Sequence, residues 1–361
     1  MAKPVVCFCT VVMNRLTHVK QTLGVNLRDN HADGIQFILL DYTSRDGLEE
    51  YIKDNFQSAL DSERLVYYRY PSATVFNRSH SRNMAFRLAQ GDIVANVDAD
   101  NYAGPGFGVY VQSLFQDRTN VCLTGLGNPW TGEASGKLCT TKEDFLKVSG
   151  YDETFEGYGF EDYDIVNRLR FSGCEPFTIT NPSFLRVETH KIGERIVNES
   201  LIREIENILV HFIDPHKSKL LYLLADGSFR TATVVNMFTI NSDQPFKIVQ
   251  DHSYPTIHFN IEGDWECGTW SLVDQELRLE NGILSKTFHS RVSAGRRSFK
   301  GESHEYYQVT SALQLDAVIF YTQLHNRQIM MDNVARQRIR VNKVFGAGTV
   351  YKNFQNESIE L

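Results

Sequence analysis

Two carboxylates separated by one residue follow directly after an apolar, β-rich run of the chain. The run is Ile93 to Val97, and the acids are Asp98 and Asp100. Carboxylates at this spacing can share one divalent cation, and hard cations such as Mn²⁺ or Mg²⁺ prefer oxygen ligands, including those of substrate phosphates. The same tripeptide also occurs in ordinary turns. The pair is therefore a candidate cation site whose meaning depends on the residues that join it.

A second acidic block lies further along the chain, at the expected start of a helix. It contains Glu161, Asp162 and Asp164, and it follows a loop that includes Tyr158 and Gly159. Acids at a helix start can simply stabilise the free N–H groups there. A glycine-rich loop also lets backbone approach a ligand closely, and its aromatic rings suit stacking on a sugar. We expect the two acidic blocks to converge on one cleft.

One histidine is placed to join the first acidic pair. His190 follows an apolar run from Pro182 to Val187, after the acidic helix. A single histidine is often a hydrogen-bonded structural residue, and it is equally a common metal ligand. Its position makes it a candidate third ligand beside Asp100.

The elements that would position these residues alternate between strands and helices. Apolar runs at 5–12, 35–40, 65–70 and 93–97 are separated by stretches with helical spacing. This rhythm predicts an α/β fold with a mostly parallel, right-handed, Rossmann-like sheet. Ligands of such sheets bind beyond the carboxyl ends of the strands. Those ends carry Thr10, Asn14, Arg15, Asp41, Asp98 and Asp100.

The second half of the chain has a different pattern. Residues 193–212 are expected to form a connecting helix, and short β-prone runs follow, for example at 231–240 and 317–323. We therefore expect a first domain over 1–214 and a β-rich domain over 215–361. The aromatic residues of this second domain are compatible with three roles, namely a sandwich core, a glycan-binding groove and an oligomerisation surface.

Composition limits the partners. The 361 residues include 37 Lys and Arg against 44 Asp and Glu, which gives a net charge of −7 and excludes a basic field for nucleic acid. Six scattered cysteines, no signal peptide and no membrane-spanning run favour a cytoplasmic protein. A basic cluster over 291–300 leaves peripheral contact with the inner face of a membrane open.

At this point the ordered motifs resemble a known family. The segments 10–15, 41–46, 81–92 and 98–100 look like those of family 2 glycosyltransferases of GT-A fold, and 150–164 is similar to the acceptor-side segment of β-1,4-galactosyltransferases and bacterial chondroitin-type polymerases. The resemblance covers about residues 4 to 191.

The resemblance implies a role for each matching residue. Nucleotide-sugar binding would fall to Thr10, Asn14, Arg15, Asp41, Arg82, Asp98 and Asp100. Acceptor binding would fall to Trp130, Tyr158 and Gly159. Asp162 would act as the catalytic base beside Glu161, and Mn²⁺ or Mg²⁺ would be held by Asp100 and His190 with Asp98 nearby.

The implied activity is an inverting, metal-dependent glycosyltransferase. It would move a sugar from a UDP-linked donor to a hydroxyl of a glycan or glycoconjugate, as in surface polysaccharide synthesis. Three other classes stay open: a retaining polypeptide-directed hexosaminyltransferase, a non-catalytic carbohydrate-binding protein and a nucleotidyltransferase. The last of these normally has a glycine-rich phosphate loop, which the segment 10–15 lacks.

Overall fold

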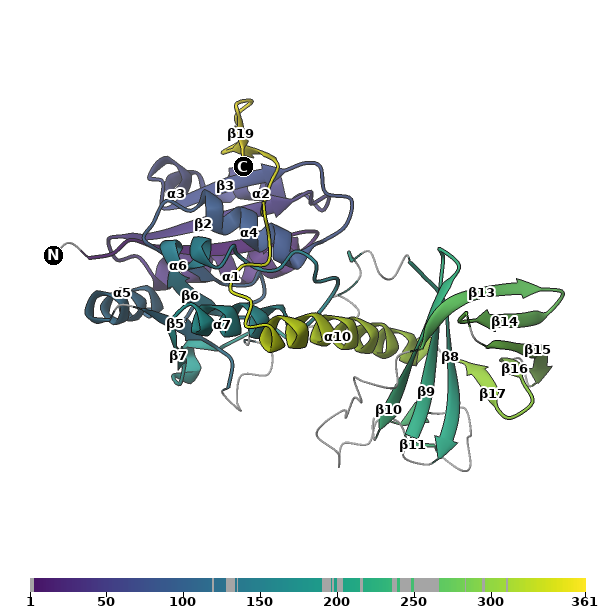
Figure 1. Cartoon of the computed structure of the whole chain (residues 1–361). Helices are drawn as coiled ribbons and strands as arrows, with labels where there is room; N and C mark the ends of the chain where they lie inside the picture. The colour runs from purple at the N-terminus through teal and green to yellow at the C-terminus, as the bar shows by residue number, and fades with distance from the viewer. Residues whose placement is uncertain are drawn as a thin grey trace. The chain divides into compact units, whose positions relative to one another are not determined.

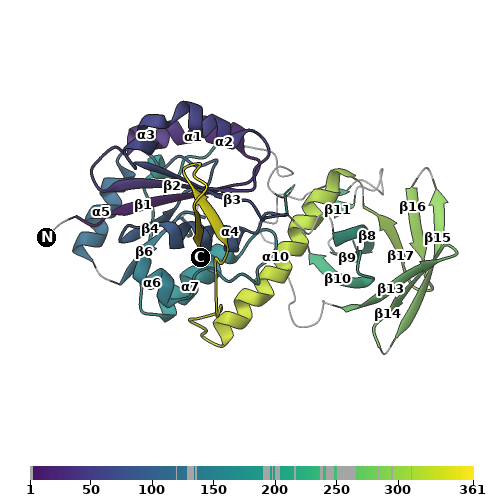
Figure 2. The same cartoon turned by 90° about the horizontal axis from the view of Figure 1, so that it is seen from above.

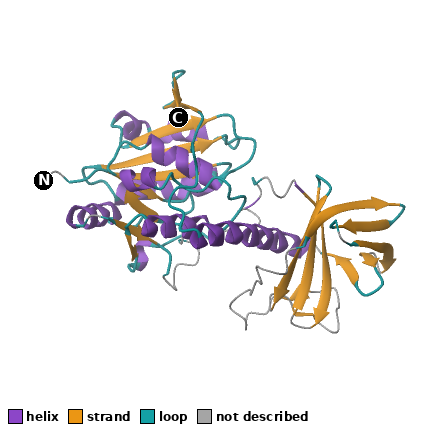
Figure 3. Cartoon of the chain, viewed as in Figure 1, coloured by secondary structure: helices purple, strands orange, loops and turns teal. Residues whose placement is uncertain are grey.

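The computed structural model divides the chain into two compact units. The first contains residues 1–191 and 329–361, and the second contains residues 192–328. The structure describes residues 3–118, 120–127, 134, 136–189, 196, 198–199, 204–214, 217–235, 239–240, 248–249, 266–282, 284–293, 296–309 and 311–361. Figure 3 shows mixed helices and strands in the first unit and a strand-rich second unit.

A nine-stranded sheet forms the centre of the first unit (Figure 1), in the order β19-β18-β3-β2-β1-β4-β6-β5-β7. Its strands are β1 (Val6–Val12), β2 (Ile35–Tyr42), β3 (Leu65–Tyr70), β4 (Ile93–Asn96), β5 (Val121–Thr124), β6 (Leu138–Thr141), β7 (Glu175–Thr178), β18 (Thr349–Lys352) and β19 (Ser358–Glu360). Neighbours from β3 to β4 are parallel, as are β5 and β7, whereas β6 and β18 run antiparallel to their neighbours. The predicted mostly parallel α/β sheet is therefore confirmed.

Helices cover both faces of this sheet, because its central strand is apolar on both sides. The helices are α1 (Leu16–Asp29), α2 (Leu48–Asn55), α3 (Gln57–Asp61), α4 (Arg78–Leu88), α5 (Phe107–Asp117), α6 (Lys142–Lys147), α7 (Glu161–Phe171) and the 3-10 turn η1 (Pro182–Phe184). Phe8 of β1 packs in one core with α1, α2 and α5, while Cys7 and Cys9 pack in the other with α4, α6 and α7. Figure 2 shows α1 to α3 and α4, α6 and α7 on opposite faces.

The end of the chain, residues 329–361, belongs to the first unit. This corrects the prediction that a single β-rich domain extends over residues 215–361. Strand β18 pairs with β3, and the Asn342 amide donates to the carbonyl oxygens of Ser149 and Tyr151 at 2.8 Å each. Arg87 also donates to the carbonyl of Phe345 at 2.7 Å. Tyr351 pairs with Arg69, which is 282 residues earlier in the chain, and a pairing over this distance leaves no local sequence pattern.

The second unit is a closed barrel rather than a sandwich. Its order is β10-β13-β14-β15-β16-β17-β8-β9, with a separate two-stranded ribbon of β11 and β12. The strands are β8 (Ile205–Asp214), β9 (Lys217–Leu224), β10 (Ser228–Val235), β11 (Thr239–Ile240), β12 (Ile248–Val249), β13 (Cys267–Val273), β14 (Glu276–Glu280), β15 (Ser285–Ser293), β16 (Arg296–Lys300) and β17 (Glu305–Gln308). The prediction of a β-rich second unit is confirmed, and closure removes the free sheet edges that a sandwich would leave.

Two elements of this unit differ from expectation. The connecting helix expected at 193–212 is contradicted over residues 205–212, which belong to β8. Pairing with β9 and β17 satisfies the backbone of this strand, while Leu209, His211 and Ile213 alternate toward the barrel interior. Most of residues 193–204 lie outside the described part of the chain. The β-prone run at 317–323 lies inside helix α10 (Ser311–Ala335). Here tertiary packing overrides propensity, since the Tyr321 ring meets the Tyr222 ring of β9 at 4.8 Å and the Tyr222 hydroxyl donates to the carbonyl of Ala317.

Trp270 forms part of the barrel wall, where its partly buried ring packs against the core and its indole N–H donates to the carbonyl of Leu224 at 2.9 Å. In the described part of the chain, no helix combines the length and apolarity that crossing a bilayer requires.

Candidate functional site

A buried arginine gathers three carboxylates beyond the carboxyl end of the central strands. Arg82 lies on α4 and is 2% exposed. Its guanidinium donates to Asp162 Oδ1 at 2.9 Å, to Asp98 Oδ1 at 3.0 Å and to Glu161 Oε1 at 3.3 Å. The planar fork of arginine suits several carboxylates at once. The two acidic blocks predicted to converge therefore do so through Arg82.

Asp98 belongs to this cluster through the end of β4. The amide of Asn96 donates to Asp98 Oδ1 at 2.9 Å and to the carbonyl of Gly136, also at 2.9 Å. Burial alone would raise the pKa of Asp98, but Arg82 and the Asn96 hydrogen bond outweigh that effect and lower it. Asp98 is therefore an ionised carboxylate with both oxygens committed to Arg82.

Asp162 behaves differently, although it shares the same arginine. Its side chain is 16% exposed and lies in the first turn of α7. Burial raises the pKa of Asp162 to about 7, and the nearby charges of Glu161 and Asp98 add to the increase, while Arg82 and Arg78 oppose it. Two carboxylates on one guanidinium thus have pKa values pushed apart, an arrangement typical of acid–base sites.

The start of α7 is built to present these acids rather than to cap itself. Phe160 occupies the N-cap position with φ of 69° and makes no side-chain capping hydrogen bond. Glu161 is 5% exposed and lies 3.7 Å from Arg78 Nε as well as near Arg82. The side chains of Glu161 and Asp162 therefore form ion pairs with arginines of α4, rather than only capping the helix.

Asp164 corrects the expectation that every acid of this block faces the cleft. It is 1% exposed and accepts from Arg168 Nε at 2.7 Å and from the Asn333 amide at 2.9 Å. Because Asp164 lies two residues beyond Asp162 on a helix, it points to a different side. Its role is to hold α7 against the end of α10.

The loop of Tyr158 and Gly159 is held beside the acids by Arg78. The Arg78 guanidinium donates to the carbonyl of Gly157 at 2.7 Å and lies 5.0 Å from the Tyr158 ring centroid. Gly159 has φ of 103°, a conformation that favours glycine. The loop predicted to bind the acceptor therefore borders the acidic cluster.

Gly136 is a site residue that the sequence analysis missed. A Cβ there would lie 2.9 Å from Asp98 Oδ2, 3.0 Å from Arg82 Nη2 and 3.2 Å from Asp162 Oδ2. A larger residue at this position would have to displace the ends of these ion-paired side chains. Arg78 and Asn96 were also missed, since neither belongs to a motif, although Arg78 precedes Arg82 by one helical turn and faces the same way.

Residues predicted to bind the nucleotide lie at the ends of β1 and β2. The Thr10 hydroxyl donates to the carbonyl of Val97 at 2.7 Å, and Asn14 has φ of 55°. Asp41 is 1% exposed, with its carboxylate accepting from the Ser44 N–H at 2.6 Å and the Tyr67 hydroxyl at 2.7 Å. Asp41 thus shapes the loop after β2. Arg15 adjoins Asn14 and is half-buried.

Asp100 lies beside the segment that leads to His190. The Glu188 N–H donates to the Asp100 carbonyl at 2.8 Å, and Asn101 forms a β-bridge with Val187. The Asp100 carboxylate is half-buried and accepts from the Asn101 amide at 2.9 Å. His190 and Trp130 lie outside the described residues. Among the described residues, no group of three or more His, Cys, Asp or Glu is arranged to hold a metal.

Two family models match the first unit. Residues 7–130 match the glycosyl transferase family 2 model, and residues 121–193 match the model described as the N-terminal domain of galactosyltransferase. Together they cover the segments from which the resemblance was drawn, so that recognition is confirmed. These matches identify this part of the chain as a glycosyltransferase domain.

Individual relatives are similar over shorter or more distant stretches. Chondroitin sulfate synthase 3 from human and from mouse is 38% identical over 48 residues, which is 13% of this chain and 5% of each relative. The mannosyltransferase PcManGT from Pyrobaculum calidifontis, solved with GDP-Man and Mn²⁺, has a TM-score of 0.42 at 16% identity over 50% of this chain and 56% of its own. Drosophila β1,4-galactosyltransferase 7 with xylobiose has a TM-score of 0.37 at 14% identity over 54% of this chain and 74% of its own.

Proposed function

We propose that this glycosyltransferase transfers a sugar from a UDP-linked donor to a hydroxyl of a glycan or glycoconjugate, with inversion at the anomeric carbon. The observation that carries the proposal is Asp162, a carboxylate on Arg82 whose pKa of about 7 suits a general base at neutral pH. The chondroitin sulfate synthase and galactosyltransferase likenesses support a glycan acceptor. Synthesis of a surface polysaccharide or glycoconjugate is the setting we propose.

The proposed step needs one proton acceptor and one leaving group. The acceptor hydroxyl oxygen forms a bond to the anomeric carbon as the bond from that carbon to the diphosphate oxygen breaks. The hydroxyl proton passes to Asp162, and the electron pair of the broken bond leaves with the nucleoside diphosphate. Attack opposite the leaving group gives a β-linked product from an α-linked donor.

Arg82 holds the base ready for this step. Its guanidinium holds Asp162 and Asp98 at hydrogen-bond distance, and the backbone of Gly136 lies close to all three side chains, so that little reorganisation is needed. Arg78 holds Tyr158 at the edge of the cluster, where its ring can stack on an acceptor sugar.

A divalent cation fits the half-buried carboxylate of Asp100. Because both Asp98 oxygens accept from Arg82, Asp100 is the better oxygen ligand of the pair. We propose that Asp100 holds Mn²⁺ or Mg²⁺ together with His190, with Asp98 nearby. When bound, the cation would offset the negative charge of the leaving diphosphate.

The experiment is a comparison of two carboxylate-to-amide variants. Purified chain is assayed for release of nucleoside diphosphate from a panel of nucleotide sugars with Mn²⁺ and candidate glycan acceptors. Asp162→Asn is expected to lower kcat by about 10²- to 10⁴-fold, because it removes the base while keeping its shape. Glu143→Gln, on the exposed start of α6, is the matched control and should leave kcat unchanged.

Three outcomes would reject the proposal. Full activity of Asp162→Asn would remove this residue from the chemistry. An α-linked product, seen by NMR of the anomeric proton, would show retention and favour the polypeptide-directed class. Binding of nucleotide sugar without any release of nucleoside diphosphate would indicate a non-catalytic carbohydrate-binding protein.

A further inference from the structure

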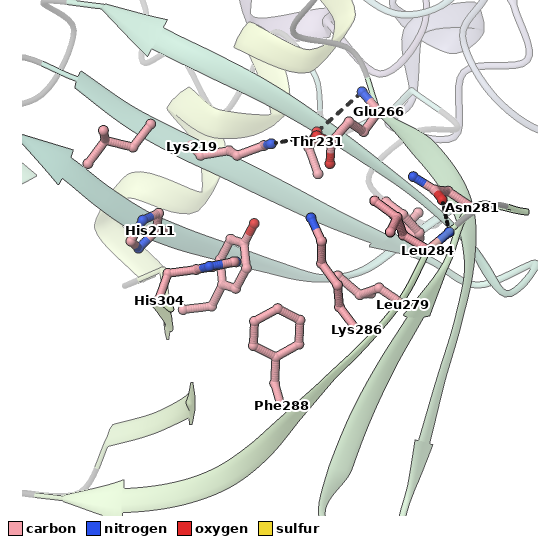
Figure 4. A pocket seen from close by; sticks show the side chains of 13 residues that line it. His211, Lys219, Thr231, Glu266, Leu279, Asn281, Leu284, Lys286, Phe288 and His304 are labelled. Carbon is pink, nitrogen blue, oxygen red and sulfur yellow. Dashed lines mark hydrogen bonds and ion pairs between the residues drawn. The ribbon is translucent and has the colours of Figure 1, made fainter. Parts of the chain in front are cut away.

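The barrel of the second unit contains a partly open cavity of about 220 Å³. Its lining includes the side chains of two lysines and two histidines, and aromatic rings among which are Phe288 and Tyr306; the lysines are Lys219 and Lys286, and the histidines are His211 and His304. Figure 4 shows the lysines, the histidines and Phe288 around one space. Small barrels commonly hold one ligand in such an interior.

The charges around this cavity favour an anion. Lys219 Nζ lies 3.1 Å from Glu266 Oε1, so one positive charge is already offset. No ion pair joins the Lys286 ammonium to another described residue. Figure 4 shows Lys286 extending into the cavity from above Phe288. The cavity therefore has a net positive charge of about one at neutral pH, from two lysines and one glutamate.

The histidine pair can add to that charge. His211 Nδ1 lies 3.1 Å from the carbonyl of Glu305, which can only accept, so Nδ1 carries the proton and Nε2 is the remaining nitrogen. The two imidazoles are 4.9 Å apart. Burial lowers the pKa of His211 and of His304, and in both cases neighbouring lysines contribute to the decrease. An anion in the cavity would reverse that effect and favour protonation.

A second part of the cavity wall is apolar and aromatic, and it adjoins the histidine pair. The Phe288 ring meets the imidazole of His304 at 5.2 Å and the ring of Tyr306 at 5.4 Å. Phe229 and Leu279 complete this wall from β10 and β14. Ring C–H groups of a sugar pack well on such faces, whereas a bare inorganic anion would gain nothing from them. The volume matches one sugar ring rather than a chain.

We propose that the barrel cavity binds one acidic sugar residue, with its carboxylate or sulfate group against Lys286 and the histidine pair and its ring on Phe288. This inference goes beyond the proposed transfer reaction and does not depend on it. It assigns the second unit the recognition of an anionic glycan.

The test is calorimetric titration of the full chain with sodium glucuronate, glucose, N-acetylglucosamine 6-sulfate and inorganic sulfate. Glucuronate or the sulfated sugar should bind at least about tenfold more tightly than glucose and inorganic sulfate, because only the acidic sugars use both walls. The relative affinities of the two acidic sugars identify the acidic group. Binding should tighten between about pH 7.5 and about pH 5.5 as the imidazoles take up protons.

Matched variants locate the binding. Lys286→Gln should weaken binding of the acidic sugar by about tenfold, whereas Lys300→Gln, on an exposed position of β16, should not change it. His304→Gln should remove most of the pH dependence and serves as a second variant if Lys286→Gln fails to fold. Asp162→Asn should bind as the unaltered chain does.

Three results would overturn the inference. The first is equal affinity for glucose and glucuronate, or for inorganic sulfate and the sulfated sugar. The second is equal affinity of the Lys286→Gln and Lys300→Gln variants. The third is binding that is lost in Asp162→Asn but kept in Lys286→Gln, which would place the acidic sugar in the first unit.

Discussion

The two units solve the problem of buried charge in opposite ways. In the first unit three carboxylates surround Arg82 at 2.9 to 3.3 Å, and burial, together with the charges of Glu161 and Asp98, raises the pKa of Asp162. In the second unit two lysines and two histidines face one glutamate, and burial, together with the neighbouring lysines, lowers the pKa values of both histidines. Each site therefore holds a charge imbalance that a ligand or a proton would relieve.

The difference also shows which sites sequence reasoning can find. The acidic cluster is built from strand ends and a helix start, and both features are local, so Asp98, Glu161 and Asp162 could be selected from motifs. The barrel cavity combines His211 of β8, Lys286 of β15 and His304 of the turn before β17. No local sequence pattern indicates that these three residues lie together, so the cavity could not be predicted.

The largest expected effect comes from removing the Arg82 guanidinium, which the three carboxylates of the first site share. Arg82→Ala should lower the free energy of unfolding of the first unit by about 3–5 kcal/mol, because it leaves buried carboxylates without a partner. Chemical denaturation followed by circular dichroism measures this loss. Arg28→Ala is the control, since the Arg28 side chain is 71% exposed and should change stability by less than about 1 kcal/mol. Equal losses in both variants would mean that Arg82 does not hold the acids.

Gly136→Ala tests the close approach of backbone to the acidic cluster. The added Cβ would lie 2.9 Å from Asp98 Oδ2 and 3.0 Å from Arg82 Nη2, which is closer than van der Waals contact, so these side chains must shift. We expect the free energy of unfolding to fall by about 1–3 kcal/mol and kcat to decrease. Gly24→Ala is the control, because its Cβ would have 4.0 Å to the nearest atom and lies within helix α1. Unaltered activity of Gly136→Ala would show that the loop does not restrain the site.

The smallest expected effect concerns the pH dependence of the barrel. The pKa values of His211 and His304 are lower in the folded chain than the ordinary 6.5, so the unfolded chain binds more protons as pH falls below 6.5. The barrel should therefore lose stability as pH decreases through that region, and His304→Gln should reduce the loss. Hydrogen exchange of β8 and β17 at several pH values measures it. His289→Gln is the control, since the His289 side chain is 68% exposed.

The fold of the first hundred residues could be predicted because strand and helix alternate there with short connections. Strands expected at 5–12, 35–40, 65–70 and 93–97 correspond to β1 to β4. The later elements depend on long-range pairing. Strand β18 pairs with β3, which begins at Leu65, and helix α10 is apolar on several sides, so neither element shows a clear hydrophobic period.

The candidate site could be predicted in part for the same reason. Arg82 was selected as a residue near the donor, but its contacts with Asp98 and Asp162 depend on how α4 and α7 pack, which the sequence does not encode locally. Gly136 is recognisable only once the cluster is in place. The role of His190 stays a prediction, as does that of Trp130.

The central claim is that Asp162 is the base, and the pH profile of kcat/KM tests it most directly. Because the pKa of Asp162 is raised to about 7, the rate should fall on the acid side with an apparent pKa near that value. Asp162→Asn should abolish that limb along with most of the activity, while Glu143→Gln keeps it. An acid limb near the ordinary aspartate value of about 4, or an unchanged limb in Asp162→Asn, would contradict the account.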